Sequence, residues 1–380
     1  MRRFRFPQTA ATLLVVAVVA FFPAAGRAQE QQGGAEPPPP TTVPEQPPAE
    51  QPALDPEAVA EKLKVKILFT DGVKTVAIPR ADLGFKVVSL EPVRFEVDRA
   101  PLKRALEAQA DVFKAEARNA KPYTFKGEFH LDPGQHARAL NVPTTAELFA
   151  RAVEKDASTV RWQVTLNKTP PALTAEALEG IDGVLASFSS VAAKNASRDN
   201  NIAVAVASIH GMVLKPGETF SLNQTVGERT KARGFQTATV FVNAKPVPGV
   251  GGGVSQVTGT LFNAAALAGL TIDEVNPHSR PVAYLPLGRD ATVAYGDKDL
   301  RFTNNTDAPI YITYTFRNQT LSVTLFGKKT PGEQISLRPS IQRLGPGKIN
   351  AQLYRIVKQD GKVISKSRLF SHAYRWQPGT

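Results

Sequence analysis

The segment GVGGGVSQVTGTLFNAAALAGL, residues 249–270, is the stretch on which the interpretation of this sequence turns. Three consecutive glycines permit positive φ angles and close backbone approach. A helical pattern follows over about 255–268, and Gly269 is placed to end it. The apolar residues spaced to cover one face are Val257, Leu261, Ala264 and Ala268. We therefore expect Ser255 at the start of a central helix, where free backbone N–H groups stabilise an anion.

The sequence on both sides of this helix is rich in glycine, threonine and valine, which predicts strands. Hairpins are expected around Asn318-Gln319 and Asp360-Gly361, and a further strand over 280–288 (RPVAYLPLG). Helices are expected over about 175–193 and from Asp199 to His210. Together these segments predict an α+β fold in which an antiparallel sheet packs on one central helix.

The preceding part of the chain predicts a smaller N-terminal α+β domain. Asp71-Gly72 lies between alternating apolar and polar residues, which indicates a hairpin with a tight two-residue turn. Helical patterns cover about 100–120 and 145–154. The pair Pro170-Pro171 marks the expected boundary. We expect domains over 57–170 and 173–330, followed by a C-terminal β-hairpin extension over 331–380 that packs on the second domain.

Residues 1–28 have the pattern of a cleaved signal segment: Arg2, Arg3 and Arg5, an apolar run from Ala10 to Phe22, and small residues before the end. That run has 13 residues, and a membrane-spanning helix needs about 20. Residues 29–56 carry nine prolines and predict a disordered tether. The expected location is therefore secreted, in the cell envelope, with membrane contact only through an uncleaved signal segment.

The part of the chain expected to fold, residues 57–380, is basic. Four of the 46 Lys and Arg and five of the 34 Asp and Glu precede it, which leaves 42 and 29 and a net charge of +13. Outside the cytoplasm this charge favours peptidoglycan or another anionic wall polymer as partner. No aromatic-studded basic motif indicates nucleic acid. The oligomeric state is left open.

Cysteine is absent, which excludes disulfides, zinc-thiolate sites and a thiol nucleophile. The five histidines lack the short spacing of helical metal sites. We predict no metal and no cofactor.

Three long segments in order resemble the VanW-like proteins, a family named after an accessory gene of glycopeptide-resistance clusters. They are LKPGETFSLNQTVGERTKARGFQTATVF, GVGGGVSQVTGTLFNAAALAGL and NPHSRPVAYLPLGRDATVAYGDKDLRFTNNTDAPIYI. Upstream, HLDPGQHARALNVPTTAELFARAVEK more loosely resembles the peptidoglycan-binding module that often precedes this domain. The family often carries cysteine where this chain has Ser255. The resemblance implies cell-wall biology, including vancomycin-resistance clusters, rather than a particular reaction.

Ser255, His278 and Asp290 follow one another in the chain as nucleophile, histidine and aspartate. This order, with the nucleophile opening a central helix, is similar to papain-like and transglutaminase-like enzymes, and the triad requires only geometry. Each residue also has a plain structural interpretation: Ser255 as a helix N-cap, His278 in a buried turn, Asp290 bonded to loop backbone. Ser255 is thus a working nucleophile, a remnant in a binding-only site, or a position that never did chemistry.

Other polar or flexible residues of the matched segments are candidates for binding a ligand in the same cleft. Arg229 carries a planar fork suited to a carboxylate. The further candidates are Gly251, Gly252, Gly253, Gln256, Glu218 and Asn223. Two functions remain open at this point. One is an envelope protein that binds peptidoglycan or its precursors without turnover, and the other is an acyl-transfer or amide-cleaving enzyme acting on stem peptides through Ser255, His278 and Asp290.

Overall fold

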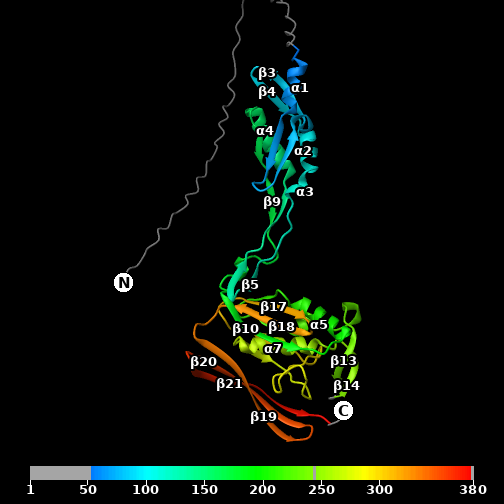
Figure 1. The fold of residues 1–380 in the computed structure, drawn as a ribbon, viewed down its shortest axis with the longest axis vertical. Helices are drawn as coiled ribbons and strands as arrows, with labels where there is room; N and C mark the ends of the chain where they lie inside the picture. Colours follow the sequence, from blue (N-terminus) through cyan, green and yellow to red (C-terminus); the bar gives the residue numbers. More distant parts are fainter. Residues whose placement is uncertain (1–52, 243–244, 378–380) are drawn as a thin grey trace, which may run out of the picture. The chain divides into compact units, whose positions relative to one another are not determined.

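The computed structural model describes residues 53–242 and 245–377 (Figure 1). The predicted signal segment 1–28 and nearly all of the tether 29–56 lie outside these residues. Helices and mostly antiparallel strands are both abundant, which confirms the α+β class. Within the described ranges, no helix combines the length and apolar character needed to cross a membrane.

The N-terminal part has its own hydrophobic core, in which Phe69 and Phe149 pack edge to face with ring centroids 4.9 Å apart. Asn141 caps the longest helix of this part by accepting a hydrogen bond from the Thr144 N–H. The elements are α1 (Pro56–Lys64), β1 (Lys66–Thr70), β2 (Thr75–Pro79), β3 (Phe85–Leu90), β4 (Val93–Val97), α2 (Arg99–Glu107), α3 (Ala110–Phe113), β5 (Lys121–Phe125), β6 (Glu128–Asp132), β7 (Ala137–Leu140), α4 (Val142–Lys155), β8 (Arg161–Gln163) and β9 (Leu166–Thr169).

Two predictions for this part need correction. The hairpin at Asp71 exists, but its turn spans residues 71–74 rather than two residues, because the Asp71 carboxylate accepts the backbone N–H groups of Val73 and Lys74. The helix predicted over 100–120 ends at Glu107, with one short turn after it. Beyond that turn Ala115 forms an isolated β-bridge, so strand pairing overrides the helical propensity of the sequence.

The second part contains a four-stranded antiparallel sheet of order β10-β18-β17-β11. Asn318 and Gln319 form the tight turn between its central strands with φ angles of 48° and 59°, which confirms the predicted hairpin. The elements are β10 (Gly183–Val191), α5 (Ala196–Ile209), β11 (Val213–Leu214), β12 (Thr219–Ser221), α6 (Leu222–Val226), β13 (Thr237–Val242), β14 (Lys245–Val250), α7 (Val254–Leu267), β15 (Thr271–Glu274), β16 (Arg301–Thr303), β17 (Ile310–Arg317) and β18 (Thr320–Gly327).

The helix predicted over 175–193 is wrong. Its place is taken by a short 3₁₀ turn, Glu176–Leu178, and by β10, which pairs with β18 along its length. Ala186 and Ser190 of β10 are buried, and β10 contacts α7. The need to complete the sheet that covers α7 therefore decides the structure of this segment.

Helix α7 is the centre of the second core and is enclosed on all sides. It contacts β10 and β18 of the four-stranded sheet, helix α5, and β19 of the C-terminal sheet. Twelve of its residues are buried, whereas the sequence predicted a single covered face. Its buried polar side chains are satisfied, as when Thr258 and Thr260 donate to carbonyls one turn back, at 3.0 and 2.6 Å.

A three-stranded antiparallel sheet follows, made of β19 (Glu333–Gly345), β20 (Lys348–Gln359) and β21 (Lys362–Arg375). The hairpin at Asp360-Gly361 is confirmed, and β19 is a strand that the sequence prediction missed. Leu337 and Leu353 of this sheet belong to the core around α7. The C-terminal segment therefore packs on the second part, as predicted.

Candidate functional site

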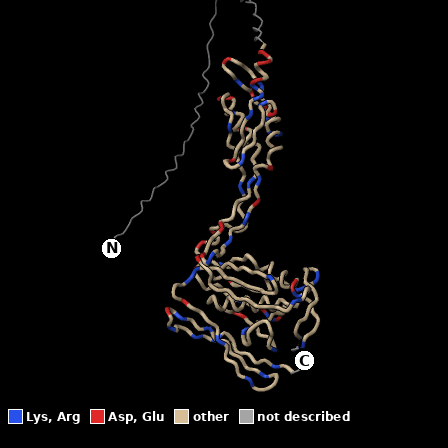
Figure 2. Tube along the Cα trace, viewed as in Figure 1, with Lys and Arg blue, Asp and Glu red and all other residues tan. Residues whose placement is uncertain are grey.

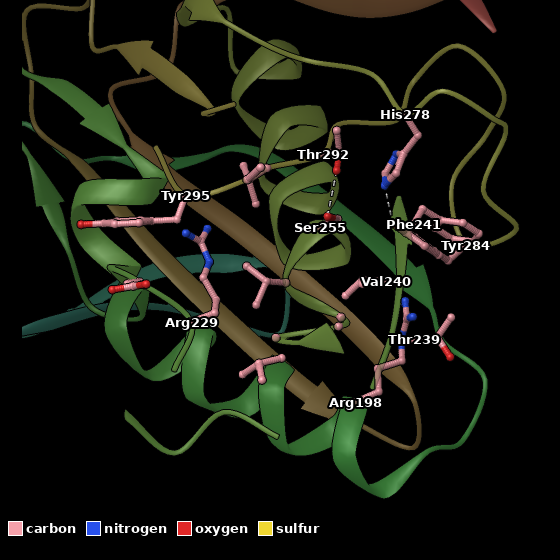
Figure 3. A pocket seen from close by; sticks show the side chains of 18 residues that line it. Arg198, Arg229, Thr239, Val240, Phe241, Ser255, His278, Tyr284, Thr292 and Tyr295 are labelled. Carbon is pink, nitrogen blue, oxygen red and sulfur yellow. Dashed lines mark hydrogen bonds between the residues drawn. The ribbon is translucent and has the colours of Figure 1, made fainter. Parts of the chain in front are cut away.

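A cavity of about 300 Å³ lies at the N-terminal end of α7 (Figure 3). Its walls come from the glycine turn 251–253, the first residues of α7, the strand β13 and the loops that carry His278 and Thr292. Arg198 of α5 and the neighbouring residues Glu228 and Arg229 also line it. Segments far apart in the sequence thus meet at one helix end.

The glycine turn brings the backbone close to β13. Gly253 is the N-cap residue of α7 and has a φ of 112°, a conformation that favours glycine. A Cβ atom on Gly252 would lie 2.5 Å from the carbonyl oxygen of Thr239, so this position accepts only glycine without movement of the strand. These two requirements explain why glycine stands at positions 252 and 253.

Ser255 is the second residue of α7 and lines the cavity. It is not the N-cap, so its interpretation as a capping residue is wrong. Its hydroxyl is instead 3.1 Å from the hydroxyl of Thr292 (Figure 3). The serine thus lies in the first turn, where backbone N–H groups have no partner within the helix.

His278 and Asp290 form a buried pair, with 5 % and 2 % of their surfaces exposed. One carboxylate oxygen of Asp290 accepts the backbone N–H of His278 at 2.8 Å and lies 2.8 Å from ring Nδ1. Burial would raise the pKa of Asp290, but the hydrogen bonds from His278 and Tyr374 outweigh it and hold that pKa below its usual value. An ionised Asp290 therefore keeps the proton on Nδ1.

The other ring nitrogen of His278, Nε2, lies 3.4 Å from the hydroxyl of Tyr284. Burial raises the pKa of Tyr284, so this hydroxyl stays protonated and is available as a donor. The rings of Tyr284 and Phe241 both stand edge-on to the imidazole, at 6.4 and 6.5 Å between centroids. His278 is therefore held in one orientation on the cavity wall.

Strand β21 supports the pair from behind the cavity. The Tyr374 hydroxyl donates to the second carboxylate oxygen of Asp290, and Tyr374 is fully buried. His372 donates from Nε2 to the backbone carbonyl of His278 at 2.8 Å, and burial lowers its pKa, which favours the neutral ring. Two residues of the C-terminal sheet thus hold the loop that carries His278.

Two arginines of the cavity have no carboxylate partner among the described residues. Arg229 Nη1 donates to Asn223 Oδ1 at 2.7 Å, and burial lowers the pKa of Arg229 without removing its charge. Arg198 Nη2 donates to Gln256 Oε1 at 2.8 Å, and its guanidinium lies 5.1 Å from the centroid of the Tyr284 ring. Both cations are therefore held in place by neutral groups.

The structure separates the remaining candidates. Gly251, Gly252, Gly253 and Arg229 line the cavity with Ser255 and His278. Gln256 is fully buried between Arg198 and Ser190, Asn223 holds Arg229, and Glu218 accepts the Lys215 N–H in an exposed turn. These last three do not line the cavity. Within the described part of the chain, no group of three or more His, Asp or Glu residues is arranged to hold a metal ion.

Residues 197–326 match the family model described as VanW like protein. The chain contains a VanW-like domain. All the cavity-lining residues lie inside this domain. Tyr374 and His372, which support the site, lie outside it.

Curated relatives match the VanW-like domain over part of their length. YoaR of Bacillus subtilis (strain 168) is 40% identical over 158 residues, which are 42% of this chain and 52% of that protein. The Vancomycin B-type resistance protein VanW of Enterococcus faecalis (strain ATCC 700802 / V583) is 29% identical over 136 residues, 34% of this chain and 50% of that protein. The chain thus spans about half the length of the curated relatives it matches.

Among solved structures, an Enterococcus faecium L,D-transpeptidase C442S mutant aligns with 51% of this chain and 74% of its own, at 10% identity and a TM-score of 0.21. An avibactam carbamoyl form of the enzyme Ldtfm aligns with 51% of this chain and 73% of its own, at 10% identity and a TM-score of 0.22. Similarity at this level carries no argument about the VanW-like domain.

Sequence reasoning missed several residues of the site in the VanW-like domain. Arg198 directly precedes the helix predicted from Asp199 and was given no role. Tyr284 was assigned to a strand, and Thr292 was not proposed for the site. The segment 280–288 forms a loop instead of the predicted strand, because Pro281 and Pro286 lack the N–H groups that a strand ladder needs. The two prolines were the available signal.

Proposed function

We propose that this chain is an exported cell-envelope protein whose cavity binds the peptide part of peptidoglycan or of its precursors. The observation that carries the proposal is the pair Arg198 and Arg229, which line one cavity without an ion-pair partner in the described residues. Both side chains are partly buried, and a cation in such a place without a counter-charge is costly. A carboxylate of a bound ligand would supply that charge.

The unused donors in the cavity wall support an anionic ligand. Nη2 of Arg229 and Nε of Arg198 are buried, and neither has a hydrogen-bond partner in the described structure. The first turn of α7 adds backbone N–H groups and the positive end of the helix dipole beside them. Stem peptides end in a carboxylate and carry further amide groups. Both kinds of group can accept hydrogen bonds from the arginine side chains and from the backbone N–H groups of α7.

The match of residues 197–326 to the VanW-like family model and the similarity to the Vancomycin B-type resistance protein VanW favour peptidoglycan as the source of that ligand. The signal pattern over residues 1–28 favours export. Ser255 favours binding over turnover, because its hydroxyl is paired with Thr292 and a serine needs an aligned base to react.

Isothermal titration of a synthetic stem pentapeptide into the purified chain tests the proposal. Arg229→Ala should weaken binding at least about tenfold, since a charged hydrogen bond contributes about 1.5–3 kcal/mol. Arg317→Ala, an exposed arginine at the end of β17, is the matched control and should leave affinity unchanged. Equal affinity of both variants, or no binding by the unmodified chain, would reject the cavity as the binding site.

The second candidate is an acyl-transfer or amide-cleaving enzyme, and the specific observation in its favour is the pair His278 and Asp290 on the wall that Ser255 shares. In that reaction Ser255 Oγ would bond to a peptide carbonyl carbon while its proton passes through His278 to the leaving amine. Incubation with purified peptidoglycan, followed by mass analysis of the muropeptides, decides between the two. New products that vanish in Ser255→Ala indicate turnover, and retention without products indicates binding alone.

A further inference from the structure

The C-terminal sheet carries many Lys and Arg and few Asp or Glu (Figure 2). From Glu333 to Arg375 the sequence has nine Lys or Arg and two Asp or Glu, a net charge of +7. Residues 57–380 together carry +13. This sheet therefore carries about half of the net charge of the described protein in a small part of its length.

Strand register places most of these cations on one face. Ile349, Ala351 and Leu353 of β20 point inward and are buried, so the alternate residues of β20 face outward. Tyr354 is opposite Arg338 of β19 and Arg368 of β21, and Ile356 is opposite Lys366. We call this outward surface the basic face; its cations are Arg338, Lys348, Lys358, Lys366, Arg368 and Arg375.

The charges of the basic face are not neutralised by the protein. None of these six cations forms an ion pair with a carboxylate of the described residues. The two acidic residues of the segment, Glu333 and Asp360, lie at the start of β19 and in the β20–β21 turn. Lys366 lies 5.0 Å from the ring centroid of Tyr354, a contact with an aromatic ring rather than with an anion.

We propose that the basic face binds a linear, phosphate-linked polyanion such as a poly(polyol phosphate) chain of the cell wall. A strand of 12 residues is about 40 Å long at about 3.3 Å per residue, so the face offers an extended track. Lys348 and Arg375 are opposite each other on neighbouring strands, about 5 Å apart. Lys366 and Arg368 are two residues apart on β21, about 7 Å. Arg338 and Arg368 lie on the two sides of Tyr354, about 10 Å apart. Such spacing lets one chain meet several cations in succession.

The polar neighbours of these cations favour a polymer over a lipid surface. Ser340, Gln352 and Ser371 form the next row of the face and offer hydrogen bonds to phosphate oxygens. The exposed large apolar side chains of the sheet, Leu344, Val363 and Ile364, lie near its turns rather than along the track. A membrane-binding surface needs an apolar face that enters the interface.

Binding of purified poly(glycerol phosphate) to the chain tests this proposal, measured by titration at 20 and 150 mM salt, where the Debye length is about 21 and 8 Å. The triple variant Arg338→Ser, Lys366→Ser, Arg368→Ser should bind at least about tenfold more weakly at low salt. The slope of log affinity against log salt concentration should be smaller in magnitude by about two, because each of the three lost phosphate contacts contributes about 0.7 to that slope. Lys66→Ser, Lys103→Ser, Arg104→Ser removes the same charge from exposed sites of the N-terminal part and should bind as the unmodified chain does.

Two results would overturn the proposal: equal losses in both triple variants, which would show an effect of net charge alone, and binding only to phosphatidylglycerol vesicles. Thermal unfolding verifies that the variants fold, and the single reversal Lys366→Glu gives a second test on an exposed side chain. The proposal is independent of the cavity, since stem-peptide binding should be unaffected by changes on the basic face.

Discussion

Tyr374 donates a hydrogen bond to Asp290 across 84 residues of sequence. The other oxygen of that carboxylate holds the backbone and ring of His278. The last strand of the C-terminal sheet is therefore part of the support for the cavity wall of the VanW-like domain. The first two predictions follow from this relationship.

Tyr374→Phe should lower the free energy of unfolding by about 1–3 kcal/mol, because it leaves a buried carboxylate oxygen without its donor. Urea unfolding measures the change. The control is Tyr354→Phe, which removes a half-buried hydroxyl that bonds to Gln352 at 2.5 Å on β20 of the same sheet. Its expected cost is about 0.5 kcal/mol or less. Equal losses of unfolding free energy in the two variants would show that the hydrogen bond to Asp290 contributes no more than an ordinary hydroxyl contact.

The pair His278 and Asp290 should make stability depend on pH. The pKa of Asp290 is lower in the folded protein than its unfolded value of about 3.9. Its stabilising effect is therefore complete above the unfolded pKa and is lost as pH falls through the folded pKa. Unfolding free energies of the unmodified chain and Asp290→Asn should differ most near pH 6 and converge toward pH 3. Parallel curves across this range would contradict the assignment.

Ser255→Cys should create a reactive thiolate, because a thiol in the first turn of α7 beside His278 has a lowered pKa. The chain has no cysteine of its own, so alkylation reports on this position alone. Iodoacetamide at pH near 6.5 should react at least about tenfold faster than with Ser208→Cys, which lies on the exposed side of α5, and adding His278→Ala should slow the reaction. Equal rates for the two cysteines would mean that the cavity does not activate position 255.

Limited proteolysis should cut first within 29–56 and next near Thr169 to Thr174. A fragment covering 173–380 should unfold cooperatively, since the core around α7 lies wholly within it. It should be less stable than the whole chain, because Tyr311 and Phe326 lose their packing against Phe129 and Leu131. Calorimetry measures both properties, and a fragment without a thermal transition would show that the two parts do not fold independently.

The sequence predicted those features that depend on neighbouring residues. The start and end of α7, the turns at Asn318-Gln319 and Asp360-Gly361, and the closeness of His278 to Asp290 all follow from local chemistry or from spacings of about a dozen residues. The proposed roles of Ser255, His278 and Asp290 remain predictions.

The rest depended on contacts between distant segments. Residues 183–191 have a composition compatible with a helix, and only the pairing of β10 with β18 makes them a strand. Arg198 reaches the cavity from α5, and Tyr374 reaches Asp290 from β21. Neither placement has a signal in a single sequence, because each is set by how the sheets enclose α7.

The limits of the family match differ from the limits of the segment that encloses α7. Similarity to the family model ends at residue 326 and begins at residue 197, yet β10 and the C-terminal sheet, which cover two sides of the helix, lie beyond those limits. A polypeptide trimmed to 197–326 would expose a helix that has no solvated face and would aggregate through it. The segment that matches the family model is thus shorter than the segment needed to enclose α7.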